Sequence, residues 1–168
     1  MEYRDLYDIN RTLTGKSIKK GDLIPKNNYI LVVLIFIQNA MGDFLIQKRS
    51  EKKNGKYAST GGHPKSGESS VQGIITEVQE ELGLVISPDE LKLIYSGRQD
   101  ETQVFFDVYY MKKDLDISTL SIQEDEVAFV EWASIERIKE LAAKDLFFKN
   151  HYEEFERLFD AFRENSIV

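Results

Sequence analysis

The feature that most constrains the fold is an apolar run at residues 29–38, composed almost entirely of Ile, Val, Leu and aromatic residues. A strand that faces water on one side alternates apolar and polar residues, whereas a strand covered on both sides is apolar throughout. The run is also too short to cross a bilayer, which takes about 20 helical residues. We therefore expect a strand that is buried on both faces of a sheet.

The segments around this run predict strands and helices in mixed order. Turn residues at 39–42 lead into a second strand at 44–49, which we expect to pair with the first as a hairpin. Further strands are expected at 57–60, 91–96, 102–111 and 127–132, and helices at 134–142 and 146–163. This order predicts an α/β (α+β) fold, a mixed β-sheet sandwiched between helices.

Length and composition limit the organisation and the partners. The 168 residues suit one domain, with an extended or hairpin-like lead-in at 1–28, a loop-helix at 62–84 and C-terminal helices at 134–168. The net charge of −7 argues against nucleic-acid binding, which needs a basic surface. No signal-peptide or membrane-spanning pattern is present, so we expect a cytoplasmic protein without a membrane partner. The chain has no cysteine, which excludes disulfides and cysteine nucleophiles.

The loop-helix at 62–84 carries the most informative side chains. Ser69 is expected to cap the helix and Gly83 to end it. Glu77, Glu80 and Glu81 fall on one arc of the helical wheel, and no Lys or Arg lies between positions 68 and 91 to neutralise them. A solvated acidic face is one interpretation. The other is a divalent cation, which would relieve the repulsion and prefers carboxylate oxygens.

The spacing of these residues resembles the Nudix box, G-x5-E-x7-R-E-U-x-E-E-x-G-U, where U is a bulky aliphatic residue. The matching positions are Gly62, Glu68, Glu77, Val78, Glu80, Glu81, Gly83 and Leu84. The resemblance implies a Nudix fold and a hydrolase that cleaves a diphosphate linkage by water attack on phosphorus, with Mg²⁺ or Mn²⁺ as cofactor. Its expected substrate is a small molecule, a nucleoside diphosphate linked to another group.

The resemblance also implies roles for individual residues. Glu77, Glu80 and Glu81 would bind the metal, Gly62 would lend its backbone carbonyl, and Glu68 would brace the loop. Relatives often take a general base or a further ligand from a later carboxylate. The candidates here are Glu124, Asp125 and Glu126, with Glu126 counted among the catalytic residues.

One box position departs from the pattern, because Thr76 stands where the family has an arginine that orients the glutamates. Because of this departure, a nucleotide-binding module with weakened catalysis remains an alternative. A second alternative is an isopentenyl-diphosphate isomerase-like protein, since residues 59–64 resemble the corresponding isomerase loop. Those isomerases use a cysteine where this chain has Gly61, so their known route cannot operate.

Substrate contacts are expected from residues ahead of the helix. Lys48 and Arg49 end a strand and suit a phosphate, His63 suits a phosphate or metal contact, and Tyr57 suits stacking on a base. Surface or packing roles remain open for all four. His151 is expected to be a surface or packing residue. A homodimer through the apolar C-terminal helices or the N-terminal segment is a further expectation.

Overall fold

The apolar run forms strand β3 (Ile30–Gln38), which lies at the centre of the fold in a computed structural model that describes residues 1–165. β3 pairs in parallel with β8 (Val104–Lys112) along its whole length. Its side chains alternate between two core clusters, one containing Leu31, Val33, Ile35 and Ile37 and the other Leu34 and Phe36. The prediction of a strand buried on both faces is confirmed.

The other strands extend this mixed sheet on both sides. Within residues 1–165 it has seven strands in the order β5-β4-β3-β8-β7, with β6 added to β3 and β9 added to β4. The remaining bounds are β4 (Phe44–Arg49), β5 (Tyr57–Ala58), β6 (Thr60–Gly62), β7 (Lys92–Gln99) and β9 (Val127–Ala133). Short 3-10 turns occupy Glu51–Lys53, Pro88–Glu90 and Ile117–Thr119.

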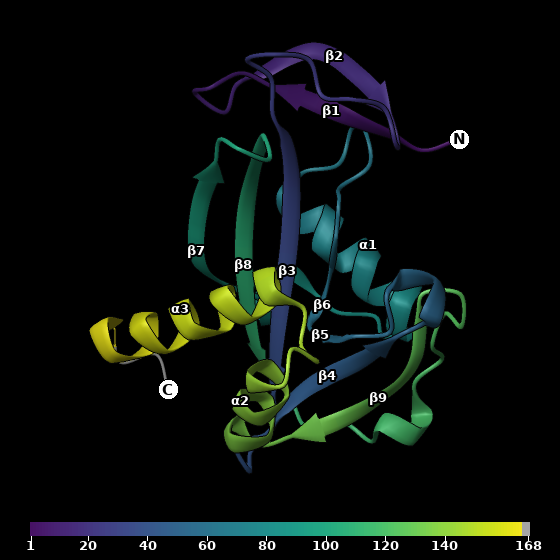
Figure 1. Cartoon of the computed structure of the whole chain (residues 1–168), viewed down its shortest axis with the longest axis vertical. Coiled ribbons are helices and arrows are strands. Elements are labelled where there is room, and N and C mark those ends of the chain that lie inside the picture. The colour runs from purple at the N-terminus through teal and green to yellow at the C-terminus, as the bar shows by residue number, and fades with distance from the viewer. Residues whose placement is uncertain (166–168) are drawn as a thin grey trace.

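Helices cover the two faces of the sheet (Figure 1). Helix α1 (Ser70–Leu82) packs Ile74, Val78 and Leu82 into the first core cluster. Helices α2 (Ile135–Ala143) and α3 (Lys149–Asn165) pack into the second cluster. The predicted α+β sandwich is therefore confirmed, while positions 166–168 of the predicted C-terminal region lie outside the described residues.

The expected hairpin of the first two apolar strands forms only at its turn. β3 and β4 pair at Gln38 and Phe44 and then separate, and β4 pairs with β9 instead. The predicted strand at 57–60 is divided for the same reason, because β5 pairs with β4 whereas β6 pairs with β3. The chain thus crosses between the two diverging strands at Ser59.

The last helix begins later than the sequence predicts. Residues 146–148 are extended and run beside β5, where the Tyr57 N–H donates to the Leu146 carbonyl at 2.8 Å and the Phe148 N–H donates to the Tyr57 carbonyl at 2.7 Å. These backbone bonds keep the segment out of the helix. They also bring the start of α3 to the edge of the sheet.

The lead-in forms the predicted hairpin, β1 (Tyr3–Tyr7) and β2 (Leu13–Lys19), above the main sheet (Figure 1). The Arg11 guanidinium donates to both oxygens of Asp107, at 2.8 and 2.5 Å. Asp5 accepts a bond from the Gly67 backbone at 2.9 Å. The hairpin is therefore anchored both to the sheet and to the loop that precedes α1.

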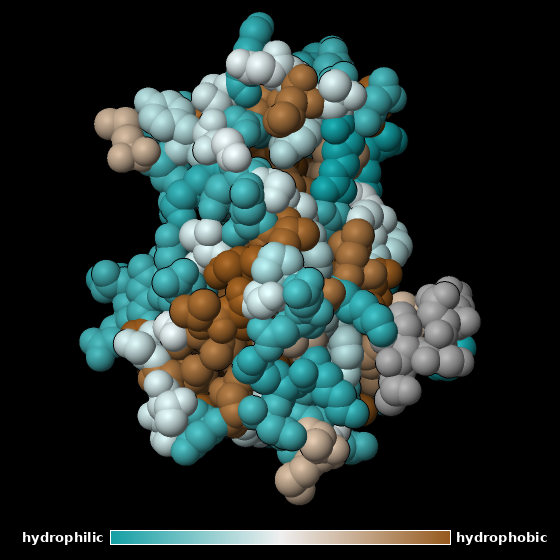
Figure 2. Space-filling view, turned by 180° about the vertical axis from the view of Figure 1, so that it is seen from behind, coloured by the Kyte–Doolittle hydropathy of each residue, from teal (hydrophilic) through white to brown (hydrophobic). Residues whose placement is uncertain are grey.

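The surface of the molecule and the length of its helices bear on two further expectations, which concern a homodimer and a membrane. Figure 2 shows apolar side chains gathered in the middle and lower part of the face opposite to that of Figure 1. The apolar stripe of α3 is not available for a dimer in the described chain, because Phe155, Leu158 and Phe162 are buried in its own core. Across residues 1–165 no helix is long and apolar enough to traverse a membrane.

Candidate functional site

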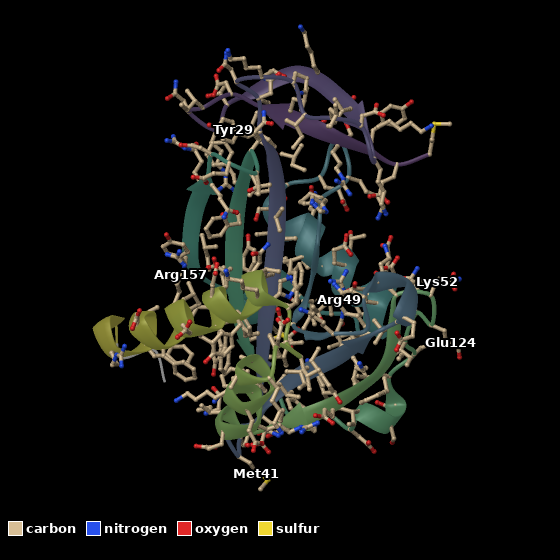
Figure 3. The ribbon with its side chains drawn as sticks, viewed as in Figure 1. Tyr29, Met41, Arg49, Lys52, Glu124 and Arg157 are labelled. Carbon is tan, nitrogen blue, oxygen red and sulfur yellow. The ribbon has the colours of Figure 1, made fainter. Side chains whose placement is uncertain are left out.

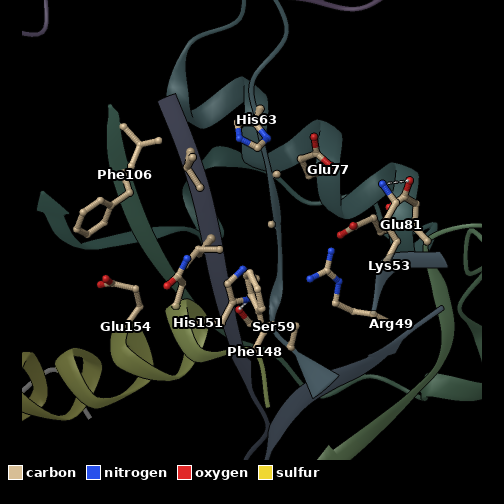
Figure 4. A pocket seen from close by; sticks show the side chains of 18 of the residues that line it. Arg49, Lys53, Ser59, His63, Glu77, Glu81, Phe106, Phe148, His151 and Glu154 are labelled. Atoms are coloured by element: carbon tan, nitrogen blue, oxygen red, sulfur yellow. Dashed lines mark hydrogen bonds and ion pairs between the residues drawn. The ribbon is translucent and has the colours of Figure 1, made fainter. Parts of the chain in front are cut away.

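A cavity of about 590 Å³ lies over the β3–β8 face beside α3 and continues to the carboxylates of α1. Its lining includes Val32 and Leu34 of β3, Phe106 of β8, and Gly61 and Gly62 of β6. Figure 4 shows Glu77 and Glu81 at one end and Phe106 and Glu154 at the other. The size falls in the range of small-molecule pockets, about 300–1,000 Å³.

Local sequence determines the position of α1. Ser69 and Gln72 form the predicted capping box, and Gly83 ends the helix with a φ of 66°. Glu68 accepts bonds from the Lys65 backbone at 2.7 Å and from the Thr76 hydroxyl at 2.6 Å. The expected bracing role of Glu68 is thus confirmed, and Thr76 contributes to it.

Two of the box glutamates occupy an environment that disfavours their negative charge. Glu81 is only 8% exposed, and its Oε2 has no hydrogen-bond partner among the described residues. Burial and the charges of Glu77 and Glu126 raise the pKa of Glu81 to about 8. Burial and the charge of Glu80 raise the pKa of Glu77 to about 7. For both carboxyls, burial and neighbouring negative charge outweigh the stabilising positive charges, Lys65 for Glu77 and Arg49 for Glu81.

Gly62 leaves room for the Glu77 carboxyl, which any larger residue at this position would displace. A Cβ at this position would lie 2.4 Å from the carboxyl carbon of Glu77. The absence of a side chain lets the β6 backbone approach the glutamates closely, which is the arrangement that the metal-binding expectation for Gly62 requires.

The third box glutamate, Glu80, also lines the cavity, but it is paired with a lysine. Glu80 forms an ion pair with Lys65, whose Nζ is 2.6 Å from Glu80 Oε1. Among the side chains that the structure describes, in residues 1–163, no group of three or more acidic or histidine residues is arranged to hold an ion. The orphaned oxygen of Glu81 and the raised pKa values nevertheless fit a cation at the Glu77–Glu81 end, and hard oxygen donors suit Mg²⁺ or Mn²⁺.

Of the three later carboxylates, the structure brings only Glu126 to the cavity. Glu126 lies close enough to raise the pKa of Glu81, and its Oε1 is 3.3 Å from Lys53 Nζ. Glu124 and Asp125 are exposed, and Glu124 points outward beside Lys52 at the edge of the molecule (Figure 3).

The residues expected to contact the substrate divide into two pairs. Arg49 and His63 line the cavity, and Arg49 lies over the ring of Phe148 with its Cζ 4.9 Å from the centroid. Lys48 and Tyr57 do not line it. Lys48 donates to the Gly55 carbonyl and lies 5.3 Å from the centre of the Tyr57 ring, which also contacts Phe129. The second pair therefore packs around the β4–β5 edge.

His63 is held in its neutral form. Burial, together with the nearby charges of Arg4 and Lys20, lowers its pKa to about 4. Arg4 and Lys20 come from the N-terminal hairpin and line the same end of the cavity. The Nε of Arg4 is buried without a hydrogen-bond partner among the described residues. The hairpin thus adds positive charge that sequence reasoning did not anticipate.

The start of α3 and the extended residue before it contribute further cavity residues, among them His151, for which the sequence indicated a surface or packing role. Phe148, His151 and Glu154 line the cavity, and Nδ1 of His151 lies 3.0 Å from the Ser59 hydroxyl. Burial, together with Arg49, lowers the pKa of His151 to about 3. His151 and Glu154 are three residues apart on one face of α3, and this spacing was the available signal for these two.

The isomerase alternative finds neither its cysteine nor space for one. A Cβ at Gly61 would lie 2.5 Å from the Val33 carbonyl oxygen and 2.5 Å from Cδ2 of Leu34. Contacts this close to a backbone atom require the strand itself to move. Any side chain at position 61 is therefore excluded in this arrangement.

Comparison with known proteins agrees with this geometry. The model of the NUDIX domain matches residues 28–156. A Nudix hydrolase of Listeria monocytogenes, lmo0368, is 35% identical over 151 residues, which are 88% of each chain. The crystal structure of DR0079 from Deinococcus radiodurans has a TM-score of 0.77 at 21% identity, and the match covers 94% of this chain and 99% of that one.

A second similar structure is that of a larger protein solved with ligands. It is a bifunctional NMN adenylyltransferase/ADP ribose pyrophosphatase from Francisella tularensis complexed with AMP and a manganese ion. Its TM-score is 0.60 at 21% identity, and the match covers 84% of this chain and 43% of that one. Since the family model and the Listeria relative both cover most of the sequence, the chain belongs to the Nudix family and is a Nudix hydrolase.

Proposed function

We propose that the chain hydrolyses a nucleoside diphosphate linked to another group, in the cytoplasm, with Mg²⁺ or Mn²⁺ held by Glu77, Glu80 and Glu81 and the Gly62 carbonyl. The proposal rests on one continuous cavity, which contains the buried Glu81 carboxyl and is also lined by positively charged and aromatic side chains. The similar F. tularensis structure, solved in complex with AMP and a manganese ion, supports the same chemistry.

The positively charged residues near Glu77 and Glu81 suit the diphosphate of the substrate. Arg49 and Lys53 approach it from the β4 side, and Arg4 and Lys20 approach it from the hairpin. Neutral His63 offers a hydrogen bond rather than a charge, because burial lowers its pKa to about 4. Together they balance substrate charge that a chain of net charge −7 would otherwise repel.

The acidic residues suit the water that attacks phosphorus. A bound divalent cation would supply Lewis acidity, lowering the pKa of the water and offsetting charge on the leaving phosphate. Glu126 is the proposed proton acceptor, since it lies beside Glu81 and its only close charge partner among the described residues is Lys53. Glu80 would leave Lys65 to join the cation.

The proposal is tested with a panel of nucleoside diphosphate sugars and dinucleoside polyphosphates, assayed with Mg²⁺, with Mn²⁺ and with EDTA. Wild type is expected to turn over at least one substrate only with metal. Glu81→Gln is expected to lower kcat by on the order of 10³-fold, a loss typical of a catalytic group. Glu140→Gln, an exposed change on α2, serves as the matched control.

Two outcomes would contradict the proposal. Tight nucleotide binding without metal-dependent turnover would indicate the weakened binding module. Equal turnover by wild type and Glu81→Gln would show that the carboxyl end of the cavity is not the reaction centre.

A further inference from the structure

The end of the cavity opposite the α1 glutamates is lined by the aromatic ring of Phe106 (Figure 4). Phe106 of β8 pairs with Gly97 of β7, and a Cβ at Gly97 would lie 2.4 Å from Cζ of the Phe106 ring. The ring therefore lies across the glycine, in space that any other residue would occupy. Tyr95 packs against it with a centroid distance of 5.7 Å, which holds the ring in place.

A buried carboxyl lies next to this aromatic surface. Glu154 of α3 is 8% exposed and lines the cavity near Phe106 (Figure 4). Neither of its carboxyl oxygens takes part in a hydrogen bond with the described residues, and Oε2 is buried. Buried polar groups are rarely left without a partner, because the loss of hydration costs about 1–3 kcal/mol. Glu154 therefore has the character of a group that is completed by a ligand.

The neighbouring Arg157 does not satisfy the Glu154 carboxyl as a hydrogen-bond acceptor. Nε of Arg157 lies 3.4 Å from Oε2 of Glu154, and Arg157 also lies over the Tyr95 ring with its Cζ 4.9 Å from the centroid. Arg157 is therefore shared between the carboxyl and the ring. Burial raises the pKa of Glu154 to about 7, although Arg157 opposes the rise. In its ionised form, above this pKa, the carboxyl presents hydrogen-bond acceptors only.

We propose that the Phe106–Glu154 end of the cavity binds the base of the substrate and that Glu154 selects bases carrying an exocyclic amino group. The inference rests on the proposed function, because that function supplies a nucleoside diphosphate whose phosphates lie at the other end. Phe106 offers the stacking face that every base can use, so it adds affinity without selection. Glu154 adds the selection, because a carboxyl oxygen accepts from the amino groups of cytosine, adenine or guanine.

Mononucleotides test the base site without involving hydrolysis. Isothermal titration calorimetry on the full chain compares CMP with UMP, and AMP and GMP with IMP. The members of each comparison differ mainly at an amino group and the adjacent ring nitrogen, or at the amino group alone for GMP and IMP. Wild type is expected to bind at least one amino-bearing nucleotide about 10- to 100-fold more tightly than its amino-free counterpart, as a charged hydrogen bond predicts.

Three variants separate selection from stacking and from folding. Glu154→Gln keeps the shape of the side chain but adds a hydrogen-bond donor. It is expected to reduce the preference to less than about threefold, which is smaller than the preference that one charged hydrogen bond provides. Phe106→Leu is expected to weaken every nucleotide about tenfold without changing the preference, because it removes stacking only. Glu156→Gln, an exposed change on the same helix, is expected to match wild type. Thermal unfolding confirms that each variant is folded.

The outcomes distinguish this inference from the proposed function. Equal affinities within every comparison, no binding of any nucleotide, or a preference that survives in Glu154→Gln would overturn the base site. Metal-dependent hydrolysis would remain a separate result in each case. Conversely, a preference that depends on Glu154 in a chain without hydrolytic activity would retain the base site and overturn the proposed function.

Discussion

Replacing Glu81 with Gln is expected to remove catalysis while making the metal-free protein more stable. The Glu81 carboxyl is 8% exposed, and its Oε2 has no partner among the described residues. Burial is the main reason that its pKa rises to about 8, and the hydrogen bond from the Gly61 backbone opposes that rise only in part. A Gln side chain has the same shape, keeps an oxygen for Gly61 and carries no charge.

The size of the effect follows from the pKa difference. The ordinary pKa is 4.5 and the folded value is about 8, so between these values the folded chain binds more protons than the unfolded chain. The free energy of unfolding therefore falls as the pH rises through this window. For Glu81 alone the loss reaches about 3 kcal/mol at pH 7 and remains below about 1 kcal/mol at pH 5.

Urea unfolding in EDTA, followed by circular dichroism from pH 5 to pH 8, measures this difference. Glu81→Gln is expected to exceed wild type in stability by an amount that grows with pH, whereas the exposed variant Glu140→Gln is expected to follow wild type. Mg²⁺ is expected to stabilise wild type and to have little effect on Glu81→Gln, because a ligand that binds only the folded state stabilises it. A Glu81→Gln protein that is less stable than wild type at pH 7, or a difference that does not change with pH, would refute the reasoning.

Three further changes test other parts of the site. Gly62→Ala places a Cβ 2.4 Å from the Glu77 carboxyl carbon, so kcat should fall on the order of 10²-fold with little change in KM; a wild-type kcat would contradict this. Arg11→Met removes the guanidinium that pairs with the buried Asp107 carboxyl. Urea unfolding should show a free energy of unfolding about 3 kcal/mol lower than in wild type, and the difference should shrink as the carboxyl is protonated at low pH. A loss below about 1 kcal/mol would be inconsistent with a buried ion pair. Thr76→Arg restores the family arginine and should raise kcat about tenfold by charge-assisted bracing; an unchanged kcat would show that the threonine is sufficient.

The sequence alone was sufficient to predict features that depend on residues close together in the chain. The caps of α1 and its acidic face follow from helical periodicity and from a few side chains within one turn of each end. The burial of β3 follows from its unbroken apolar pattern, since a polar residue on either face would be left without water. The family resemblance rests on the same short segment, so it was equally visible.

The tertiary structure decided which distant residues meet. β3 and β4 diverge because β6 and β9 compete for their edges, and this long-range competition leaves no mark in either strand. The same divergence directs Lys48 and Tyr57 into local packing.

Other cavity residues come from segments far apart in the chain. Arg4 arrives from the N-terminal hairpin, Phe106 from β8 and Glu154 from α3, and no periodicity relates positions so distant in sequence. The sequence therefore determined the chemistry of the carboxylate end. Only the packing of the hairpin, the sheet and α3 determined the cavity that would receive the rest of the substrate.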